Sequence, residues 1–354
     1  MANFLRDPTY RGKYVIDNLI WPEISLHMLR KLAGKETGDG TRHIYRPTDV
    51  RQVKLQHYQI DPATVPLARP PVINTRMAKG GVGKTTTSAN LAAAFAFMGY
   101  RTLLIDGDPQ ASLTNMMGVD AATDENIVHI GALMEAAAKG SAHDQIRAAI
   151  RPIYPSGMLD LIPADITLVQ TDAWLDRQLQ RETVFERLLE SHLDIFGRYD
   201  VILIDSAPGT SLLTVNLMLS CHTQLAVVNL DRECLKALPI LFQNVQEINS
   251  VFKANASDVE IVANGLNAGH KLEKETLGLL IDRYGEMLNE NVIPQSTAFD
   301  RQQSIPGEPA KGPLIEQDPS NPGAKAMLDL AKSLLGRYKI RLSGFDEAVP
   351  STRG

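Results

Sequence analysis

A glycine-rich loop lies between a short apolar run and a long apolar helix near residue 80. This order of elements constrains the fold more than any other feature of the sequence. Residues 72–75 form the apolar run, which we interpret as a strand. Residues 86–98 carry Ala, Leu and Phe at helical spacing and end at a glycine. The sequence therefore predicts a strand, a loop and a helix in direct succession.

The residues of this loop have the properties of a phosphate site. Gly80, Gly81 and Gly83 let the backbone turn so that successive N–H groups face one point, and the following helix adds its positive N-terminus. Lys84 would place a charge on the β- and γ-phosphates of ATP, and the Thr85 hydroxyl would ligate Mg²⁺. The alternative is a glycine-rich turn without a ligand. It is disfavoured because all the parts occur in the order that phosphate binding requires.

Three later segments are nearly continuous apolar runs, as expected for strands buried on both faces: 101–106, 200–205 and 225–230. Helical stretches separate them, so the alternation predicts an α/β fold with a mostly parallel sheet flanked by helices. Two more strands and a closing amphipathic helix are expected at 259–264, 291–294 and 324–338.

Four prolines between residues 61 and 71 mark a linker without helical periodicity. We therefore predict a small domain at residues 1–60, a linker at 61–71, an ATPase domain at 72–342 and a flexible C-terminal tail at 343–354. The net charge of −5 hides an asymmetry, because residues 1–70 carry 11 Lys/Arg and 7 Asp/Glu. Any contact of the larger, acidic part with nucleic acid would need a local basic patch.

The cysteine count and the hydropathy restrict the setting in which the chain works. Only Cys221 and Cys234 occur, which excludes a disulfide framework and fits a reducing compartment. Neither a signal-peptide core nor an apolar run of membrane-spanning length is present. We therefore expect a cytoplasmic protein without stable membrane association.

The start of the loop departs from the general pattern G-x-x-x-x-G-K-[ST], because Ala78 stands at its first glycine. Lys79 then precedes Gly-Gly-Val-Gly-Lys-Thr-Thr, which resembles the deviant Walker A loop of the ParA and MinD family of ATPases. The resemblance implies a homodimer closed around MgATP, in which Lys79 reaches the phosphates held by the other subunit. The candidate ATP-binding residues of the loop are Lys79, Gly80, Gly81, Val82, Gly83, Lys84, Thr85 and Thr86.

Two further segments resemble signatures of the same family. Residues 103–110 contain Asp108, which matches the aspartate that orients the attacking water, while Asp106 is expected to support the loop. The alternative for Asp108 is a helix or turn cap. Asp205 matches the Walker B aspartate, which would hold Mg²⁺ together with Thr85. The catalytic residues implied by the resemblance are Lys79, Lys84 and Asp108.

Asn264 and Pro294 follow or end strands and match regions of the family that contact adenine.

Two other kinds of protein in the family fit this sequence less well. The electron-carrying iron protein of nitrogenase needs cluster-ligating cysteines, and neither cysteine of this chain is placed to serve. MinD-type proteins end in a membrane-binding amphipathic helix, whereas residues 339–350 are acid-containing and interrupted by proline.

The N-terminal segment combines an apolar helical period at 24–32, a Gly-rich turn at 34–40 and a short β-like run at 41–45. A further helix follows, with Thr48 as its expected N-cap. This order resembles the winged helix-turn-helix domain of the longer plasmid partition proteins. The candidate DNA contacts are Arg30, Lys31, Arg42, Arg46 and Arg51. The alternative is a small dimerisation or packing domain with an ordinary solvated basic face.

The resemblance as a whole implies a ParA-type DNA-partition ATPase of the longer plasmid type, associated with the nucleoid. ATP-bound dimers of such proteins bind DNA without sequence preference, and a centromere-bound ParB-like partner stimulates their weak hydrolysis. Two alternatives stay open. One is a repressor of its own operon whose ATPase is a nucleotide switch, and the other is a positioner of protein cargo on the nucleoid.

Overall fold

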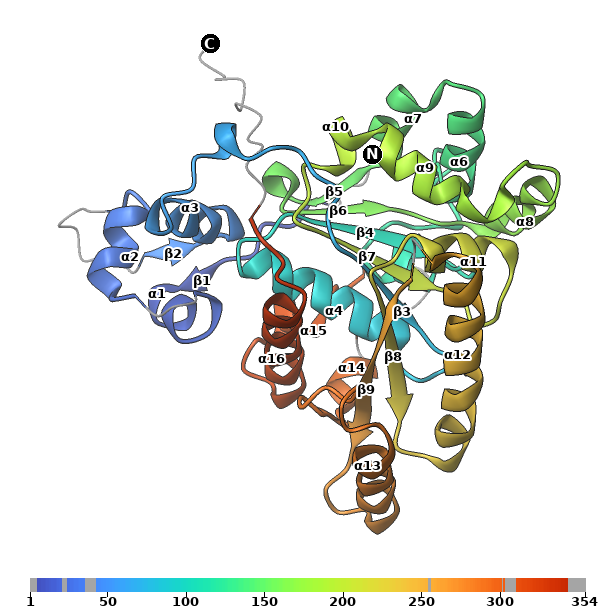
Figure 1. Cartoon of the computed structure of the whole chain (residues 1–354). Helices are drawn as coiled ribbons and strands as arrows, with labels where there is room; N and C mark the ends of the chain where they lie inside the picture. Colours follow the sequence, from blue (N-terminus) through green and yellow to red (C-terminus); the bar gives the residue numbers. More distant parts are fainter. Residues whose placement is uncertain are drawn as a thin grey trace.

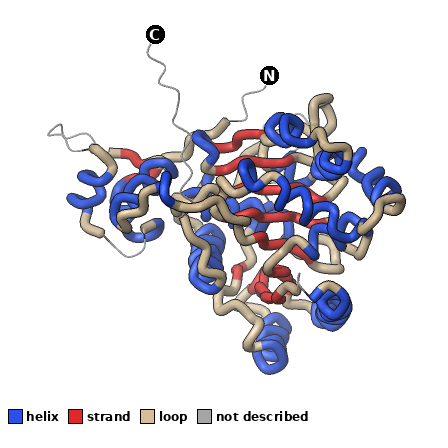
Figure 2. The backbone as a smooth tube through the Cα atoms, turned by 45° about the horizontal axis from the view of Figure 1, so that its top comes forward, coloured by secondary structure: helices blue, strands red, loops and turns tan. Residues whose placement is uncertain are grey.

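The computed structural model describes residues 5–20, 24–35, 43–253, 256–300, 302 and 310–342. Within them, eight strands form one sheet in the order β10-β9-β8-β3-β7-β4-β6-β5 (Figure 2). Every neighbouring pair is parallel except β5 and β6. The strands are β3 (Val72–Arg76), β4 (Thr102–Gly107), β5 (Arg151–Tyr154), β6 (Leu159–Ile162), β7 (Val201–Ser206), β8 (Thr223–Asn229), β9 (Asp258–Leu266) and β10 (Ile293–Pro294). The predicted α/β class with a mostly parallel sheet is confirmed.

Side chains alternate between the two faces of this sheet. On β3 and β4, Ile73 and Leu104 pack in the hydrophobic cluster of one face, whereas Val72 and Leu103 pack in that of the other. Burial on both faces explains why these strands are nearly continuous apolar runs. Figure 1 shows the helices on either side. The first face is covered by α4 (Lys84–Phe97) and α16 (Pro322–Arg337), and the second by α6 (Ile130–Ala138), α9 (Val184–Ser191) and α11 (Leu212–Leu219).

The remaining helices surround this frame. A third hydrophobic cluster lies where α12 (Arg232–Val251) and α13 (Lys271–Tyr284) pack on β8 and β9. The shorter helices are α1 (Gly12–Tyr14), α2 (Leu26–Leu32), α3 (Pro47–His57), α5 (Ser112–Met116), α7 (Ala142–Ala149), α8 (Gln170–Leu175), α10 (Leu193–Phe196), α14 (Thr297–Asp300) and α15 (Leu314–Gln317). Among the described residues, no helix has both the length and the hydrophobicity needed to cross a membrane.

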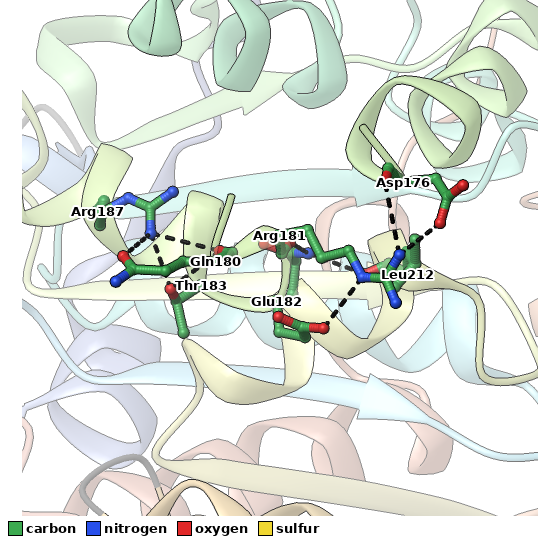
Figure 3. A network of polar contacts seen from close by, with 8 residues as sticks. Asp176, Gln180, Arg181, Glu182, Thr183, Arg187 and Leu212 are labelled. Atoms are coloured by element: carbon green, nitrogen blue, oxygen red, sulfur yellow. Dashed lines mark hydrogen bonds and ion pairs between the residues drawn. The ribbon is translucent and has the colours of Figure 1, made fainter. Parts of the chain in front are cut away.

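A polar network fixes the segment between α8 and α9 (Figure 3). Arg181 binds the carboxylate of Asp176 at 2.5 Å and that of Glu182 at 3.2 Å. Arg187 binds the side chains of Gln180 and Thr183, each at 3.0 Å. These bonds fix the conformation of the segment, which packs against α11.

The N-terminal segment forms a two-stranded antiparallel sheet and two packed helices. Strand β1 (Tyr10–Arg11) pairs with β2 (Ile44–Tyr45), and α2 packs against α3. Helix α3 starts two residues earlier than predicted, because Arg46, and not Thr48, is its N-cap. The Arg46 backbone N–H donates to Asp49 Oδ2 at 2.8 Å, which is one half of a capping box. Most of the predicted Gly-rich turn at 34–40, and the first two residues of the predicted β-like run at 41–45, lie outside the described residues.

This segment shares its core with the large sheet. The Tyr10 ring lies edge-on to Phe97 of α4 with 4.8 Å between the ring centroids, and Phe97 stacks on Tyr154 of β5 at 5.7 Å. Residues from both sides of the predicted linker belong to one hydrophobic cluster. The domain boundary at 61–71 stays a prediction, and the predicted tail at 343–354 lies outside the described residues.

Lys54 is the most unusual polar group of this interface. It is buried on α3, and its Nζ lies 4.7 Å from the centroid of the Tyr100 ring. Burial, opposed in part by the charge of Asp200, lowers the pKa of Lys54 to about 7. A lysine in the unfolded chain titrates near pH 10.5, so between these two values the folded state binds fewer protons than the unfolded state. The Lys54 contribution to the free energy of unfolding therefore rises with pH from about 7 to about 10.5.

Lys54→Met should remove this contribution. The difference in free energy of unfolding between wild type and variant should change by up to about 1.4 kcal/mol per pH unit between pH 7 and 9.5. Urea denaturation at several pH values measures it. Lys271→Met is the control, because the Lys271 side chain is 90% exposed. A pH dependence identical in wild type and Lys54→Met would show that Lys54 is charged in the folded protein.

Candidate nucleotide-binding site

The predicted motifs meet at one edge of the sheet. Strands β3, β4 and β7 run parallel, so their carboxyl ends and the segments that follow lie together. Asp205 of β7 stands in register with Thr75 of β3 on one side and with Asp106 of β4 on the other. The glycine loop follows β3 and leads into α4. This is the position in open α/β sheets where ligands bind.

The loop is held in a conformation that requires glycine. Gly81 and Gly83 have positive φ values of 72° and 89°. A Cβ on Gly83 would lie 2.5 Å from Nδ2 of Asn264, so the position lacks space as well. The Asn264 amide donates to the Val82 carbonyl at 2.8 Å. Asn264, predicted as an adenine contact, therefore supports the phosphate loop from β9, and the adenine role stays a prediction.

Lys84 opens α4 and is only 8% exposed. Its Nζ lies 3.4 Å from the Lys79 carbonyl, which is a weak contact, and no carboxylate among the described residues forms an ion pair with it. A buried ammonium is costly without compensation. The loop therefore presents a cation that suits the phosphates of a nucleotide, beside Gly80, Gly81 and the half-buried Thr86.

The predicted metal ligands are already in contact. Thr85 Oγ1 donates to Asp205 Oδ2 at 2.7 Å, and Ser88 Oγ lies 3.2 Å from Asp205 Oδ1. Burial raises the pKa of Asp205 to about 6, although Thr85 and the charge of Lys84 oppose the shift. Among the described residues, no three acidic, histidine or cysteine side chains form a complete metal cage. One carboxylate and one hydroxyl suit Mg²⁺, which keeps several waters and takes its other ligands from phosphates.

Asp106 and Asp108 have different surroundings. Asp106 is buried and accepts bonds from the Thr114 backbone N–H at 2.9 Å, the Thr114 hydroxyl at 2.7 Å and the Asp108 N–H at 3.1 Å. Burial, together with the neighbouring Asp205, raises the pKa of Asp106 to about 7. Asp108 is half-buried, and among the residues that the structure describes its side chain accepts only from the Gln110 N–H, at 2.9 Å. Asp106 thus supports the loop, and Asp108 keeps an oxygen available for a water.

The predicted adenine residues lie next to each other. Ile293 of β10 stands in register with Asn264 of β9, and Pro294 with Leu266. The Gln295 backbone N–H donates to the Leu266 carbonyl at 2.9 Å. Pro294 therefore ends the strand beside Asn264, at the same sheet edge as the glycine loop, and its contact with adenine stays a prediction.

The Lys79 side chain contacts the first turn of α12. Its Nζ lies 2.9 Å from Asp231 Oδ2 and 2.9 Å from Glu233 Oε2. The bonds to Glu233 and Asp231 raise the pKa of Lys79 above its ordinary value, so the group stays charged. The two lysines thus have different partners, although only four residues separate them in sequence.

Sequence reasoning missed several residues around this site. Ser88, one helical turn after Thr85, contacts Asp205, and its spacing was a usable signal. Arg76 ends β3 and donates to the Gly209 carbonyl at 2.9 Å, in the loop after Asp205. Asp231 and Glu233 follow β8, and their position after a predicted strand was the only signal for them.

The predicted DNA contacts of the N-terminal segment differ in exposure. Arg30 and Lys31 are exposed on α2, whereas Arg46 forms an ion pair with Asp7 at 2.7 Å and keeps a half-exposed side chain. The prediction for Arg51 is wrong: it is buried and binds Asp200 Oδ2 at 2.5 Å and the Gly99 carbonyl at 3.0 Å. Its face of α3 packs near the end of α4 and the residue that precedes β7. Arg42 lies outside the described residues.

The parallel sheet, the glycine loop and the paired Thr85 and Asp205 define a P-loop NTPase. A family model described as an AAA domain matches residues 71–258. The sporulation initiation inhibitor Soj of Bacillus subtilis is 31% identical over 257 residues, which cover 72% of this chain and 94% of Soj. The cell division protein PomZ of Myxococcus xanthus is 28% identical over 349 residues, 98% of each chain. The chain belongs to the ParA/Soj family of ATPases, which confirms the resemblance.

A solved structure supports the same fold. Cobyrinic acid a,c-diamide synthase from Mycobacterium smegmatis, with bound ADP and magnesium, is 24% identical, with a TM-score of 0.61. The match covers 78% of this chain and 97% of that chain. The predicted ligands, ATP and Mg²⁺, fit the glycine loop, Lys84, Thr85 and Asp205 of this chain.

Proposed function

We propose that this protein is a DNA-partition ATPase that closes MgATP between two copies of itself. The ATP-bound dimer binds DNA without sequence preference, and a ParB-like partner stimulates hydrolysis and so releases it. The proposal rests on the different surroundings of Lys79 and Lys84. Lys84 is buried at the phosphate loop of its own chain, whereas Lys79 lies at the surface and is available to a second copy. Family membership supports the partition role.

The residues of one chain divide the work between binding and hydrolysis. Lys84 and the loop N–H groups would hold the phosphates, and Thr85 and Asp205 would hold Mg²⁺, which neutralises charge on the phosphates. Asp108 would orient the attacking water and accept its proton. Asp106 keeps the Asp108 backbone in place through their 3.1 Å bond. Lys79 of a second copy would stabilise the charge that develops during transfer.

Lys79→Ala tests this division. The variant should bind a fluorescent ATP analogue as wild type does, because Lys84, Thr85 and Asp205 are intact. It should fail to dimerise and should hydrolyse ATP about 10²–10³-fold more slowly, since a charge that acts in the transition state is lost. Light scattering after gel filtration and steady-state turnover measure these effects. Lys271→Ala is the exposed-lysine control, and unchanged turnover in Lys79→Ala would refute a trans lysine.

A second candidate function is the positioning of a protein assembly on the nucleoid. The match to the cell division protein PomZ supports a role other than DNA partition, because it spans nearly the whole chain and includes the N-terminal segment. The two functions share one ATP cycle and differ in the partner that stimulates hydrolysis. A DNA-bound centromere protein that accelerates turnover would support partition, and acceleration by a protein without centromere DNA would support positioning.

A further inference from the structure

The first turn of α12 holds the ammonium of Lys79 between two carboxylates. Asp231 is the N-cap of this helix, and its Oδ1 accepts from the Cys234 N–H at 2.7 Å. Its other oxygen, Oδ2, binds Lys79, so one side chain caps the helix and holds the lysine. Glu233 adds a second contact at 2.9 Å. The lysine and the acids are about 150 residues apart in sequence, and they follow the neighbouring strands β3 and β8.

These contacts are of the kind that can exchange. The side chains of Lys79, Asp231 and Glu233 are 31%, 38% and 77% exposed. Exposed ion pairs are weak, so each contact can yield to a stronger anion. The triphosphate of MgATP, held by another protein molecule, is such an anion. Lys79 cannot lie between the two carboxylates and also reach the phosphates of a second copy.

We propose that Asp231 and Glu233 are positioning residues that hold Lys79 within its own chain until the MgATP of a second copy displaces them. This inference rests on the proposed function, because it assumes that Lys79 acts across a dimer. Formation of one dimer would break the contacts between Lys79 and its carboxylates in both subunits. The contacts therefore oppose dimerisation and help to keep the protein monomeric when little ATP is bound.

Two isosteric variants test the proposal. Glu233→Gln removes one charge, and Asp231→Asn removes the other while keeping the helix cap, because Asn is as good an N-cap as Asp. Glu247→Gln is the matched control, since Glu247 is exposed on the same helix and pairs with Gln243. Sedimentation in a saturating non-hydrolysable ATP analogue gives the dimer dissociation constant. Each variant should lower it by about two- to 25-fold, because two weak ion pairs no longer have to open.

A second measurement needs no dimer. Acetylation of Lys79 in nucleotide-free protein, followed by mass spectrometry with Lys271 as the internal reference, reports how firmly the amine is held. Glu233→Gln and Asp231→Asn should raise the Lys79 rate by about two- to fivefold, and Glu247→Gln should not. A general loss of folding would change both lysines and the circular dichroism spectrum.

The outcomes separate this inference from the proposed function. An unchanged dissociation constant together with unchanged Lys79 reactivity would overturn the inference. A higher dissociation constant in the variants would also overturn it, because the carboxylates would then stabilise the dimer instead of opposing it. If wild type dimerises in the analogue and the double variant Asp231→Asn/Glu233→Gln dimerises no more tightly, the inference fails while the proposed function stands. If both stay monomeric, the proposed function and this inference both fail.

Discussion

Asp108→Ala should lower the maximal rate of ATP hydrolysis by about 10²–10⁴-fold, the range expected when a positioned acid–base group is removed. ATP binding should stay near the wild-type level, because Lys84, Thr85 and Asp205 do not depend on Asp108. The loop should keep its course, since Asp106 anchors it through Thr114. The variant should therefore accumulate as an ATP-bound dimer on DNA.

Asp108→Asn distinguishes catalysis from the alternative role as a turn cap. Asparagine keeps the acceptor for the Gln110 N–H, which is the only bond that the Asp108 side chain makes among the described residues. If Asp108 only caps the turn, Asn should restore activity and Ala should reduce it. If Asp108 accepts a proton, both variants should be slow. Turnover within about threefold of wild type in Asp108→Ala would remove the catalytic assignment.

Arg51→Ala should lower the free energy of unfolding by about 3–5 kcal/mol, the usual cost of removing one member of a buried ion pair. The Asp200 side chain is fully buried, and its Oδ2, which accepts from Arg51, also accepts from the Arg101 backbone N–H at 2.6 Å. The Gly99 carbonyl would lose a donor as well. Urea denaturation measures the change. The loss should loosen α3 from the sheet, because Arg51 crosses that interface.

Arg46→Ala is the matched control for Arg51. Arg46 precedes α3 and pairs with Asp7, but both side chains are more than a third exposed. Such pairs contribute at most about 1 kcal/mol, so stability should hardly change. If Arg51→Ala were as mild as Arg46→Ala and instead weakened DNA binding, Arg51 would be a phosphate contact after all.

The parts of the site that are local in sequence were predictable. Gly80 to Thr85 form one loop and the start of the helix that follows it, so their spacing alone indicates where their backbone groups point. Asp205 and Asp106 end apolar runs, and parallel strands bring such ends to one edge. The order of the strands did not have to be known for that conclusion.

Contacts between distant segments were not predictable. Lys79 and Asp231 meet only because β8 lies next to β3, and nothing in either segment signals the pairing. Arg51 has the same sequence character as an exposed arginine of a DNA-binding helix. Its burial depends on the way in which α3 packs on the sheet near Gly99. The antiparallel strand β5 also went unpredicted, because it is short and contains Pro152.

The most direct test of the central claim is the oligomeric state of the wild-type protein on and off DNA. With a non-hydrolysable ATP analogue and Mg²⁺, the protein should sediment as a dimer and be retained on DNA of arbitrary sequence. With ADP it should be a monomer and wash off. Equal retention in the two nucleotides, or a monomer in the analogue, would contradict an ATPase that closes its nucleotide between two copies.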